Sequence, residues 1–193
     1  MRNYTALSAF LLVFIVQFSI CIAPVQAQIG GSGFSASDNS ASADDDLAKR
    51  NRLRDQCGNT EDPNVGVSVC SEFLKMRGND ERDIEISYGN LGAAYLKLHE
   101  WQPCIAAFNA AAQHNPPERD IILIYSERGA CYGWMEKYRQ AVADFNVALK
   151  HDPDNAIDLR LRGLIEKNKL GQIEQGERDI KLAHDIDPNV DNE

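Results

Sequence analysis

Residues 122–155 read ILIYSERGACYGWMEKYRQAVADFNVALKHDPDN and carry small, aromatic and proline residues at offsets that occur again elsewhere in the chain. In this segment the marked residues are Gly129, Tyr132, Ala141, Phe145, Ala148 and Pro153. The matching upstream set is Gly92, Tyr95, Phe108, Ala111 and Pro116. The matching downstream set is Gly163, Ile180, Ala183 and Pro188, with one extra residue between glycine and proline. Sets of residues that recur at nearly constant spacing along the chain predict a solenoid of repeated units.

The residue types in each set predict that the unit is a pair of helices. Glycine inside a helix costs about 1 kcal/mol relative to alanine, so its recurrence at Gly92, Gly129 and Gly163 indicates a close crossing of two helices. Phe145 and Ala148 lie three residues apart, which places them on one helix face. The proline that closes each set cannot continue a helix. We therefore expect the aromatic residues to form a core between helices rather than a ligand-binding aromatic box.

These offsets resemble the tetratricopeptide repeat, a 34-residue helix–turn–helix unit. With the glycine as position 8 of that family, the repeats are about 85–118, 122–155 and 156–190. The third repeat departs most, with Glu166 in place of the aromatic residue and Gly176 in place of alanine. The resemblance implies an all-α, right-handed solenoid over residues 48–193. Within it, residues 48–80 are expected to form a degenerate N-terminal hairpin.

The N-terminus has the pattern of an export signal. Arg2 is followed by an almost wholly apolar stretch over residues 10–22, and Val25-Gln26-Ala27 has the small residues that a signal peptidase requires. We therefore expect a signal peptide over residues 1–27, with an uncleaved anchor as the alternative. Residues 28–47 are rich in Gly, Ser and Asp, a composition typical of a disordered linker. The expected location is the bacterial periplasm, with secretion as the alternative.

The charge and the histidines argue against several function classes. The formal net charge of −9 disfavours nucleic acid and anionic membrane surfaces as partners, and no membrane insertion is expected after signal cleavage. The histidines, His99, His114, His151 and His184, lie near expected helix ends or on second helices. The sequence contains no recognisable nucleophile–base pair, phosphate loop or metal-ligand spacing. We therefore expect a protein that is not an enzyme and that uses no cofactor or metal.

Export changes the interpretation of the four cysteines beyond the signal. An oxidising compartment favours disulfides, and a bridge between Cys57 and Cys70 would hold the degenerate hairpin together. Cys104 and Cys131 fall at positions 20 and 10 of successive repeats, on neighbouring antiparallel helices. Both positions favour small residues, so we expect simple burial there and regard a second bridge as the alternative.

Positions 7 and 23 vary together among the repeats. They hold Leu and Ala in the first repeat, Arg128 and Asp144 in the second, and Arg162 and Asp179 in the third. Both residues are therefore apolar together or oppositely charged together. This pattern predicts the salt bridges Arg128–Asp144 and Arg162–Asp179, each joining the two helices of a repeat.

The family resemblance implies a concave groove, lined by the first helix of each repeat, that receives a peptide or a partner helix. The groove positions most expected to bind a partner are Leu96, Lys97, Ser126, Trp134, Arg160, Leu164 and Lys167. The same positions elsewhere hold Ile86, Ala93, Leu123, Ala130, Ile157 and Asn168. Trp134 is either an interface anchor or a packing residue against a neighbouring repeat. The cations Lys97, Arg160 and Lys167 favour a partner with an acidic segment.

The expected function is therefore that of a non-catalytic scaffold or adaptor in the cell envelope, which captures a protein segment in its groove. The alternative is a structural component that self-associates, as a homodimer for example. This alternative rests on an expected last helix at about 174–186, where Ile180, Leu182 and Ala183 would be left uncapped.

Overall fold

The computed structural model describes residues 36–192, with side chains for residues 43–191. The predicted signal peptide and the first part of the predicted linker lie outside the described residues. The described part contains eight α-helices and a short 3₁₀ helix. They are α1 (Ala36–Asn59), α2 (Pro63–Lys75), α3 (Glu81–Lys97), α4 (Trp101–Ala112), α5 (Glu118–Trp134), α6 (Tyr138–His151), α7 (Ala156–Lys169), α8 (Ile173–Ile186) and η1 (Val190–Asn192).

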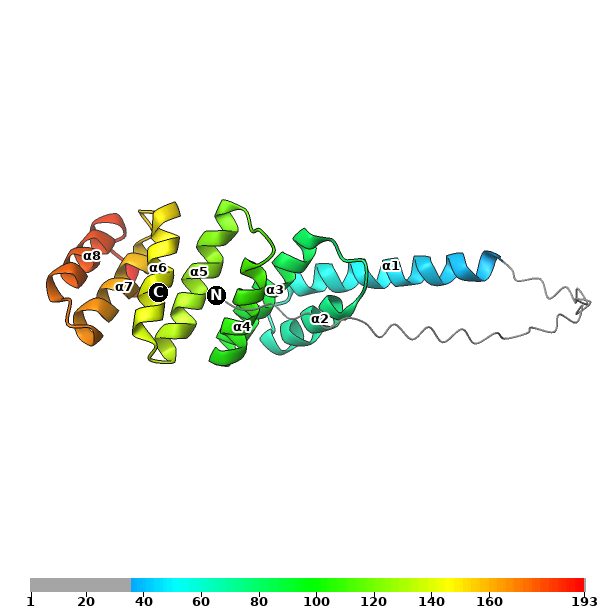
Figure 1. Cartoon of the computed structure of the whole chain (residues 1–193), viewed down its shortest axis with the longest axis horizontal. Helices are drawn as coiled ribbons and strands as arrows, with labels where there is room; N and C mark the ends of the chain where they lie inside the picture. The colour runs from blue at the N-terminus through cyan, green and yellow to red at the C-terminus, as the bar shows by residue number, and fades with distance from the viewer. Residues whose placement is uncertain (1–35, 193) are drawn as a thin grey trace, which may run out of the picture. The chain divides into compact units, whose positions relative to one another are not determined.

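The helices form successive antiparallel hairpins, each packed on the next (Figure 1). The first helices of neighbouring hairpins also touch, α1 with α3, α3 with α5 and α5 with α7. This arrangement confirms the predicted all-α solenoid of helical hairpins. No described helix combines the length and apolar character that a membrane crossing requires.

Short polar residues begin several of these helices, as expected from helix capping. The side chain of Asp62 accepts a hydrogen bond from the backbone N–H of Asn64, and Pro63 occupies the first turn of α2. Asp80 caps α3 and Asn155 caps α7 in the same way. These caps fix the residue at which each of the three helices starts.

The expected linker boundary needs correction, because α1 begins at Ala36 rather than near residue 48. The side chains of residues 43–49 are all exposed, so this first part of α1 extends beyond the packed body. Extending an existing helix costs much less than starting one, so α1 can continue outward from its packed part without an apolar face of its own. The prediction relied on an apolar pattern and therefore missed it.

The repeated glycines lie at helix crossings. A Cβ atom on Gly92 would lie 2.8 Å from the ring of Phe108, and one on Gly129 would lie 3.1 Å from the ring of Phe145. In the third hairpin a Cβ on Gly163 would lie 2.7 Å from the carbonyl oxygen of Gly176. The backbones of α7 and α8 thus approach too closely for alanine at position 176, which explains the departure from the repeat pattern.

The core residues lie within the hairpins and at the boundaries between neighbouring hairpins. Phe108 and Phe145 are fully buried, and the half-buried Tyr132 packs against the clusters to which both belong. These aromatic residues therefore form the core, as expected from their helical spacing.

Both cysteine pairs lie at disulfide distance. Cys57 and Cys70 join α1 to α2 with their Cα atoms 4.9 Å apart. Cys104 and Cys131 join α4 to α5 with their Cα atoms 6.5 Å apart. Both side chains are buried, as expected. They also face each other across the boundary between two repeats, so the structure favours the second bridge, which was the alternative.

The C-terminal end is partly capped, in contrast to the bare end that was expected. Val190 of η1 is buried in the last core cluster. Asp191 accepts a hydrogen bond from Arg160 of α7 at 2.6 Å and lies 3.2 Å from His184 of α8. Polar contacts and one buried side chain thus cover part of the final hairpin. The exposed apolar residues that remain on α8 are Ile173, Leu182 and Ile186.

Candidate functional site

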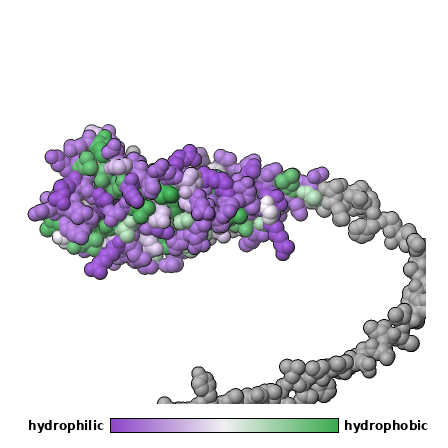
Figure 2. Space-filling view, turned by 45° about the horizontal axis from the view of Figure 1, so that its top comes forward, coloured by the Kyte–Doolittle hydropathy of each residue, from purple (hydrophilic) through white to green (hydrophobic). Residues whose placement is uncertain are grey.

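The first helices of the three regular hairpins each present one exposed aliphatic side chain at the same register. These residues are Ile86 of α3, Leu123 of α5 and Ile157 of α7, with exposed fractions of 39%, 52% and 45%. Because α3, α5 and α7 lie side by side, the three side chains form a row across the helices, which we name the apolar row. Much of the rest of the surface is hydrophilic on the face shown in Figure 2.

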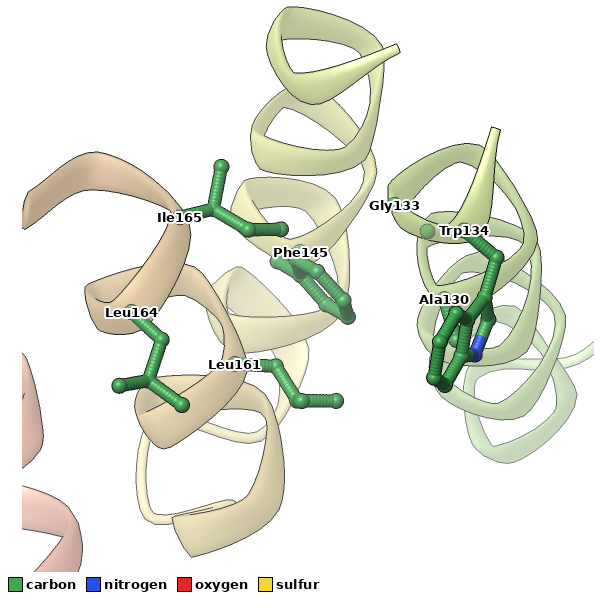
Figure 3. A pocket seen from close by; sticks show the side chains of 8 residues that line it. Ala130, Gly133, Trp134, Phe145, Leu161, Leu164 and Ile165 are labelled. Carbon is green, nitrogen blue, oxygen red and sulfur yellow. The ribbon is translucent and has the colours of Figure 1, made fainter. Parts of the chain in front are cut away.

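A hollow of about 220 Å³ lies between α5 and α7, towards the C-terminal end of α5. We name it the apolar slot. Its side walls are Ala130, Gly133 and Trp134 of α5 and Leu161, Leu164 and Ile165 of α7. Figure 3 shows the indole of Trp134 on one side, Leu161 and Leu164 on the other, and the ring of Phe145 from α6 between them.

Gly133 differs from the packing glycines. A Cβ atom there would meet only the Cδ1 atom of Ile165, at 3.6 Å, which is an ordinary contact. The same repeat position holds Leu96 in α3 and Lys167 in α7. The slot is open because this position of α5 lacks a side chain, and the internal packing of the protein does not require that absence.

Trp134 packs against the neighbouring repeat, which is one of the two roles that the sequence left open. Its indole stacks on Trp101, the first residue of α4, with ring centroids 5.5 Å apart and planes 10° apart. It is nevertheless 67% exposed. The neighbouring hairpin thus supports one side of the ring, while the side that faces the slot stays accessible. Sequence reasoning did not single out Trp101, since it lies outside the groove positions.

The structure places the other predicted groove residues in different surroundings. Leu164 lines the slot with Trp134. Leu96 is half-buried and packs on the core around Cys104. Ser126 borders a second hollow beside Leu123 and donates a hydrogen bond to Asp158 of α7. Of these residues, Trp134 and Leu164 are therefore brought together, whereas Leu96 and Ser126 contribute mainly to packing between helices.

Two of the three predicted cations already have partners within the chain. Arg160 pairs with Asp191 at 2.6 Å, and Lys167 pairs with Glu177 at 3.0 Å. Lys97 is exposed and borders a polar hollow beside the N-terminal hairpin. Since exposed ion pairs contribute little stability, a carboxylate of another protein could displace Glu177. The preference for an acidic partner is nevertheless weaker than the sequence implied.

Buried carboxyl groups lie along the contacts between first helices, a feature that the sequence did not predict. Burial raises the pKa of Glu127 to about 7, against the opposing effect of Lys97. Burial likewise raises the pKa of Asp158 to about 6, although the hydrogen bond from Ser126 opposes the shift. One oxygen of Glu127 is buried without a hydrogen-bond partner among the described residues. Perturbed carboxyls can mark catalytic sites, but these two face packed helices and not a shared cavity.

Glu166, which replaces the aromatic residue of the third repeat, is a further buried carboxyl. It is 1% exposed and accepts a hydrogen bond from Gln175 of α8 at 2.9 Å. Burial raises its pKa, and the nearby Asp179 adds to the shift. This residue therefore joins α7 to α8 and does not face the groove.

The two charged pairs expected from the repeat comparison lie together between their helices. Arg128 donates two hydrogen bonds of 2.8 Å to the two carboxylate oxygens of Asp144, and Arg162 donates one of 2.7 Å to Asp179. Each arginine also donates to an asparagine of the preceding hairpin, Asn109 or Asn146, at 2.7 Å. Each therefore joins three helices. The asparagines recur at one offset, directly after Phe108 and Phe145, and that recurrence was the available signal.

The histidines and acidic groups form no reactive centre within the described residues. His114 lies 3.4 Å from Glu81, and the equivalent His151 lies 3.0 Å from Glu118. The two pairs therefore make the same contact in successive hairpins, between the end of the second helix and the start of the first. In the part of the chain with described side chains, no group of three or more His, Cys, Asp or Glu residues is placed to hold a metal ion.

Comparisons with known proteins identify the fold. No model of a known protein family matches the chain, and no curated protein matches it. Solved structures do match. A crystal structure of MamA protein aligns with a TM-score of 0.62 and 18% identity, over 80% of this chain and 81% of that chain. The chain folds as a tetratricopeptide-type helical solenoid.

Two further structures agree with this assignment. The solenoid of MamA 41-end from Desulfovibrio magneticus RS-1 aligns with a TM-score of 0.62 and 19% identity, over 75% of this chain and 77% of that one. Another crystal structure of MamA aligns with a TM-score of 0.58 and 17% identity, over 83% of this chain and 99% of that one. At these identities the likeness concerns the solenoid fold alone.

Proposed function

We propose that this protein is a non-catalytic scaffold that holds a segment of another protein in the groove along α3, α5 and α7. The observation that carries the proposal is the exposure of the apolar row beside the open apolar slot. Exposed apolar surface of this kind, on the concave side of a helical solenoid, is typical of protein-binding sites. The partner is a polypeptide whose apolar side chains contact Ile86, Leu123 and Ile157.

The partner segment also carries carboxylates. Lys97 lies on the groove side of α3 and is exposed. Lys167 and its partner Glu177 also have exposed side chains, with fractions of 39% and 56%. Both cations are therefore available to an acidic flank. Because these contacts are at the rim, they affect association rate and salt dependence more than affinity.

Affinity capture of the disulfide-bonded protein tests this function. We expect partners that bind the wild type to be lost from the Leu123→Asp variant, since a charge in the apolar row would be buried on binding. The exposed Ala143→Asp on α6 serves as the matched control, because it adds the same charge away from the groove. A capture profile that Leu123→Asp leaves unchanged would contradict the groove function.

We also propose that the protein acts after export, in the periplasm. The apolar stretch over residues 10–22 and the small residues before Gln28 support this location, as do the two cysteine pairs at disulfide distance. Mass spectrometry of the protein from fractionated cells tests it. The expected species begins at Gln28 and has four oxidised cysteines. A cytoplasmic species with free thiols would be the opposite result.

Self-association through α8 is the second candidate function. Ile173, Leu182 and Ile186 are 54%, 44% and 39% exposed on this last helix, which supports a contact between copies. Light scattering should then detect a dimer that Leu182→Asp dissociates, whereas Leu123→Asp should leave it intact. A monomer at all concentrations would exclude this candidate and leave the groove function unaffected.

A further inference from the structure

The apolar slot has a more specific use than the rest of the groove. We propose, as a deepening of the groove function and resting on it, that the slot is an anchor pocket for one aliphatic or aromatic side chain of the partner polypeptide. That side chain enters between the indole of Trp134 and the two leucines of α7, Leu161 and Leu164. The inference rests on the size, the lining and the cause of the slot.

The size of the slot suits a single side chain. Its volume is about 220 Å³, whereas an apolar cavity of about 150 Å³ is large enough to hold a benzene ring. A leucine or phenylalanine side chain therefore fits, and a bulky multi-ring ligand would not be enclosed. The slot opens onto the groove, since Ala130, Trp134 and Leu164 occupy groove positions.

The lining selects the chemistry of the occupant. The side chains around the slot are aliphatic or aromatic, on both α5 and α7 (Figure 3). A polar or charged side chain placed there would lose its hydration without gaining a partner. An aliphatic or aromatic side chain has no hydrogen bonds to water to lose, and it buries apolar surface. The stack of Trp134 on Trp101 holds the indole wall in place before binding, which reduces the entropy lost on binding.

The cause of the slot indicates a ligand rather than a packing defect. Gly92, Gly129 and Gly163 are required by close helix crossings, but a Cβ at Gly133 would make only an ordinary contact at 3.6 Å. Gly133 lies within the last turn of α5 and weakens that turn without improving internal packing. Filling the position with leucine, as repeat one does at Leu96, would close the slot.

Peptide selection on the purified, disulfide-bonded protein tests the proposal. Random peptides displayed on phage are selected on the wild-type protein, and the enriched peptides are synthesised. Their affinities are measured by intrinsic fluorescence, because Trp134 lines the slot and Trp101, the other tryptophan of the chain, stacks on it. The peptides should share one aliphatic or aromatic residue, and its replacement by serine should weaken binding at least tenfold.

Four variants separate the slot from the groove. Gly133→Leu fills the slot and should weaken binding at least tenfold, while Ala143→Leu on the exposed side of α6 should leave it unchanged. Trp134→Ala removes one wall and should weaken binding even if Gly133→Leu fails to fold, which thermal unfolding would reveal. Leu123→Asp tests the groove itself.

Each outcome decides between the proposals. Binding that Leu123→Asp weakens but both slot variants preserve would overturn the anchor pocket and leave the groove function standing. Binding that none of these variants weakens would overturn both. A selection that yields no peptide with affinity for the wild-type protein would also overturn both.

Discussion

At the scale of single residues, two glycines on neighbouring first helices have different roles. Gly163 lies where α7 crosses α8, and the carbonyl of Gly176 leaves no room there for a Cβ atom. Gly133 has such room, and its missing side chain creates the apolar slot. The sequence predicted the first role, because the glycine recurs at one offset. It could not show the second, because the slot depends on α7, which is far from Gly133 in sequence.

Alanine substitutions at these two glycines should therefore change stability in opposite directions. Gly163→Ala forces a Cβ against the Gly176 carbonyl, 2.7 Å away in the present backbone, and should lower the free energy of unfolding by about 1–3 kcal/mol. Gly133→Ala should raise it by up to about 1 kcal/mol. Urea unfolding measures both. Equal losses of stability would show that Gly133 is also a packing glycine.

The pair Arg128–Asp144 allows a second test at this scale, because the first repeat holds Leu91 and Ala107 in the same positions. The side chain of Arg128 is 13% exposed and that of Asp144 is 9% exposed. Replacing either one alone, as Arg128→Leu or Asp144→Ala, leaves a buried charge unpaired and should cost about 3–5 kcal/mol. The double variant restores an apolar pair and should cost much less than the sum.

A double-mutant cycle with denaturant unfolding measures this coupling. The exposed pair Lys49–Glu72, with side chains 52% and 50% exposed, is the control and should show little coupling. Strictly additive losses at Arg128 and Asp144 would contradict a structural role for the ion pair.

At the scale of elements, the contacts between first helices contain two carboxyl groups whose pKa is raised by burial. Glu127 belongs to α5, and the positive charge of Lys97 on α3 partly offsets the rise in its pKa. Asp158 belongs to α7 and accepts a hydrogen bond from Ser126 of α5. Both contacts are along the groove, so the charge of these carboxyls affects how α3, α5 and α7 stay together. No pattern in the sequence marks these two residues, since burial depends on the packing of whole helices.

Stability should consequently fall as the pH rises from 5 to 8. Burial raises the pKa of Glu127 to about 7 and that of Asp158 to about 6 in the folded protein. An acid with a raised pKa stabilises the fold fully below its unfolded pKa of roughly 4. It loses that contribution as the pH passes through the folded pKa. Between pH 5 and 8 the two shifts together cover about three pKa units, so the expected loss is of the order of 4 kcal/mol, at about 1.4 kcal/mol per unit.

Unfolding in urea at a series of pH values measures this dependence. The double variant Glu127→Gln and Asp158→Asn keeps the shapes of both side chains and removes their titration, so its stability should vary less between pH 5 and 8. A wild-type protein that is more stable at pH 8 than at pH 5 would show that the two carboxyls are ionised in the fold.

At the scale of the whole described chain, the two cysteine pairs join different levels of the solenoid. Cys57–Cys70 closes the first hairpin, with a sequence separation of 13, whereas Cys104–Cys131 connects successive repeats, with a separation of 27. In a solenoid each repeat contacts mainly its neighbours. A covalent link across a repeat boundary therefore strengthens the cooperation between α3–α4 and α5–α6, and no described cysteine lies in the α7–α8 hairpin.

Removing the second bridge should therefore cost more than removing the first. On the loop-entropy estimate, Cys104→Ala with Cys131→Ala should lower the free energy of unfolding by about 3.5 kcal/mol, and Cys57→Ala with Cys70→Ala by about 3 kcal/mol. Denaturant unfolding under non-reducing conditions measures both. Free thiols in the denatured wild-type protein, detected by alkylation and mass spectrometry, would exclude the bridges.

The helical hairpins, their glycine crossings and the pairing of Arg128 with Asp144 can be inferred from the amino-acid sequence alone. These features repeat along the chain, and each depends on residues within one hairpin, so their spacing is enough to reveal them. The apolar slot, the Trp101–Trp134 stack, the burial of Glu127 and Asp158, and the Cys104–Cys131 contact are decided only by the tertiary structure. Each of these joins residues of different hairpins, and their meeting depends on how the hairpins stack, which no local pattern of residues encodes.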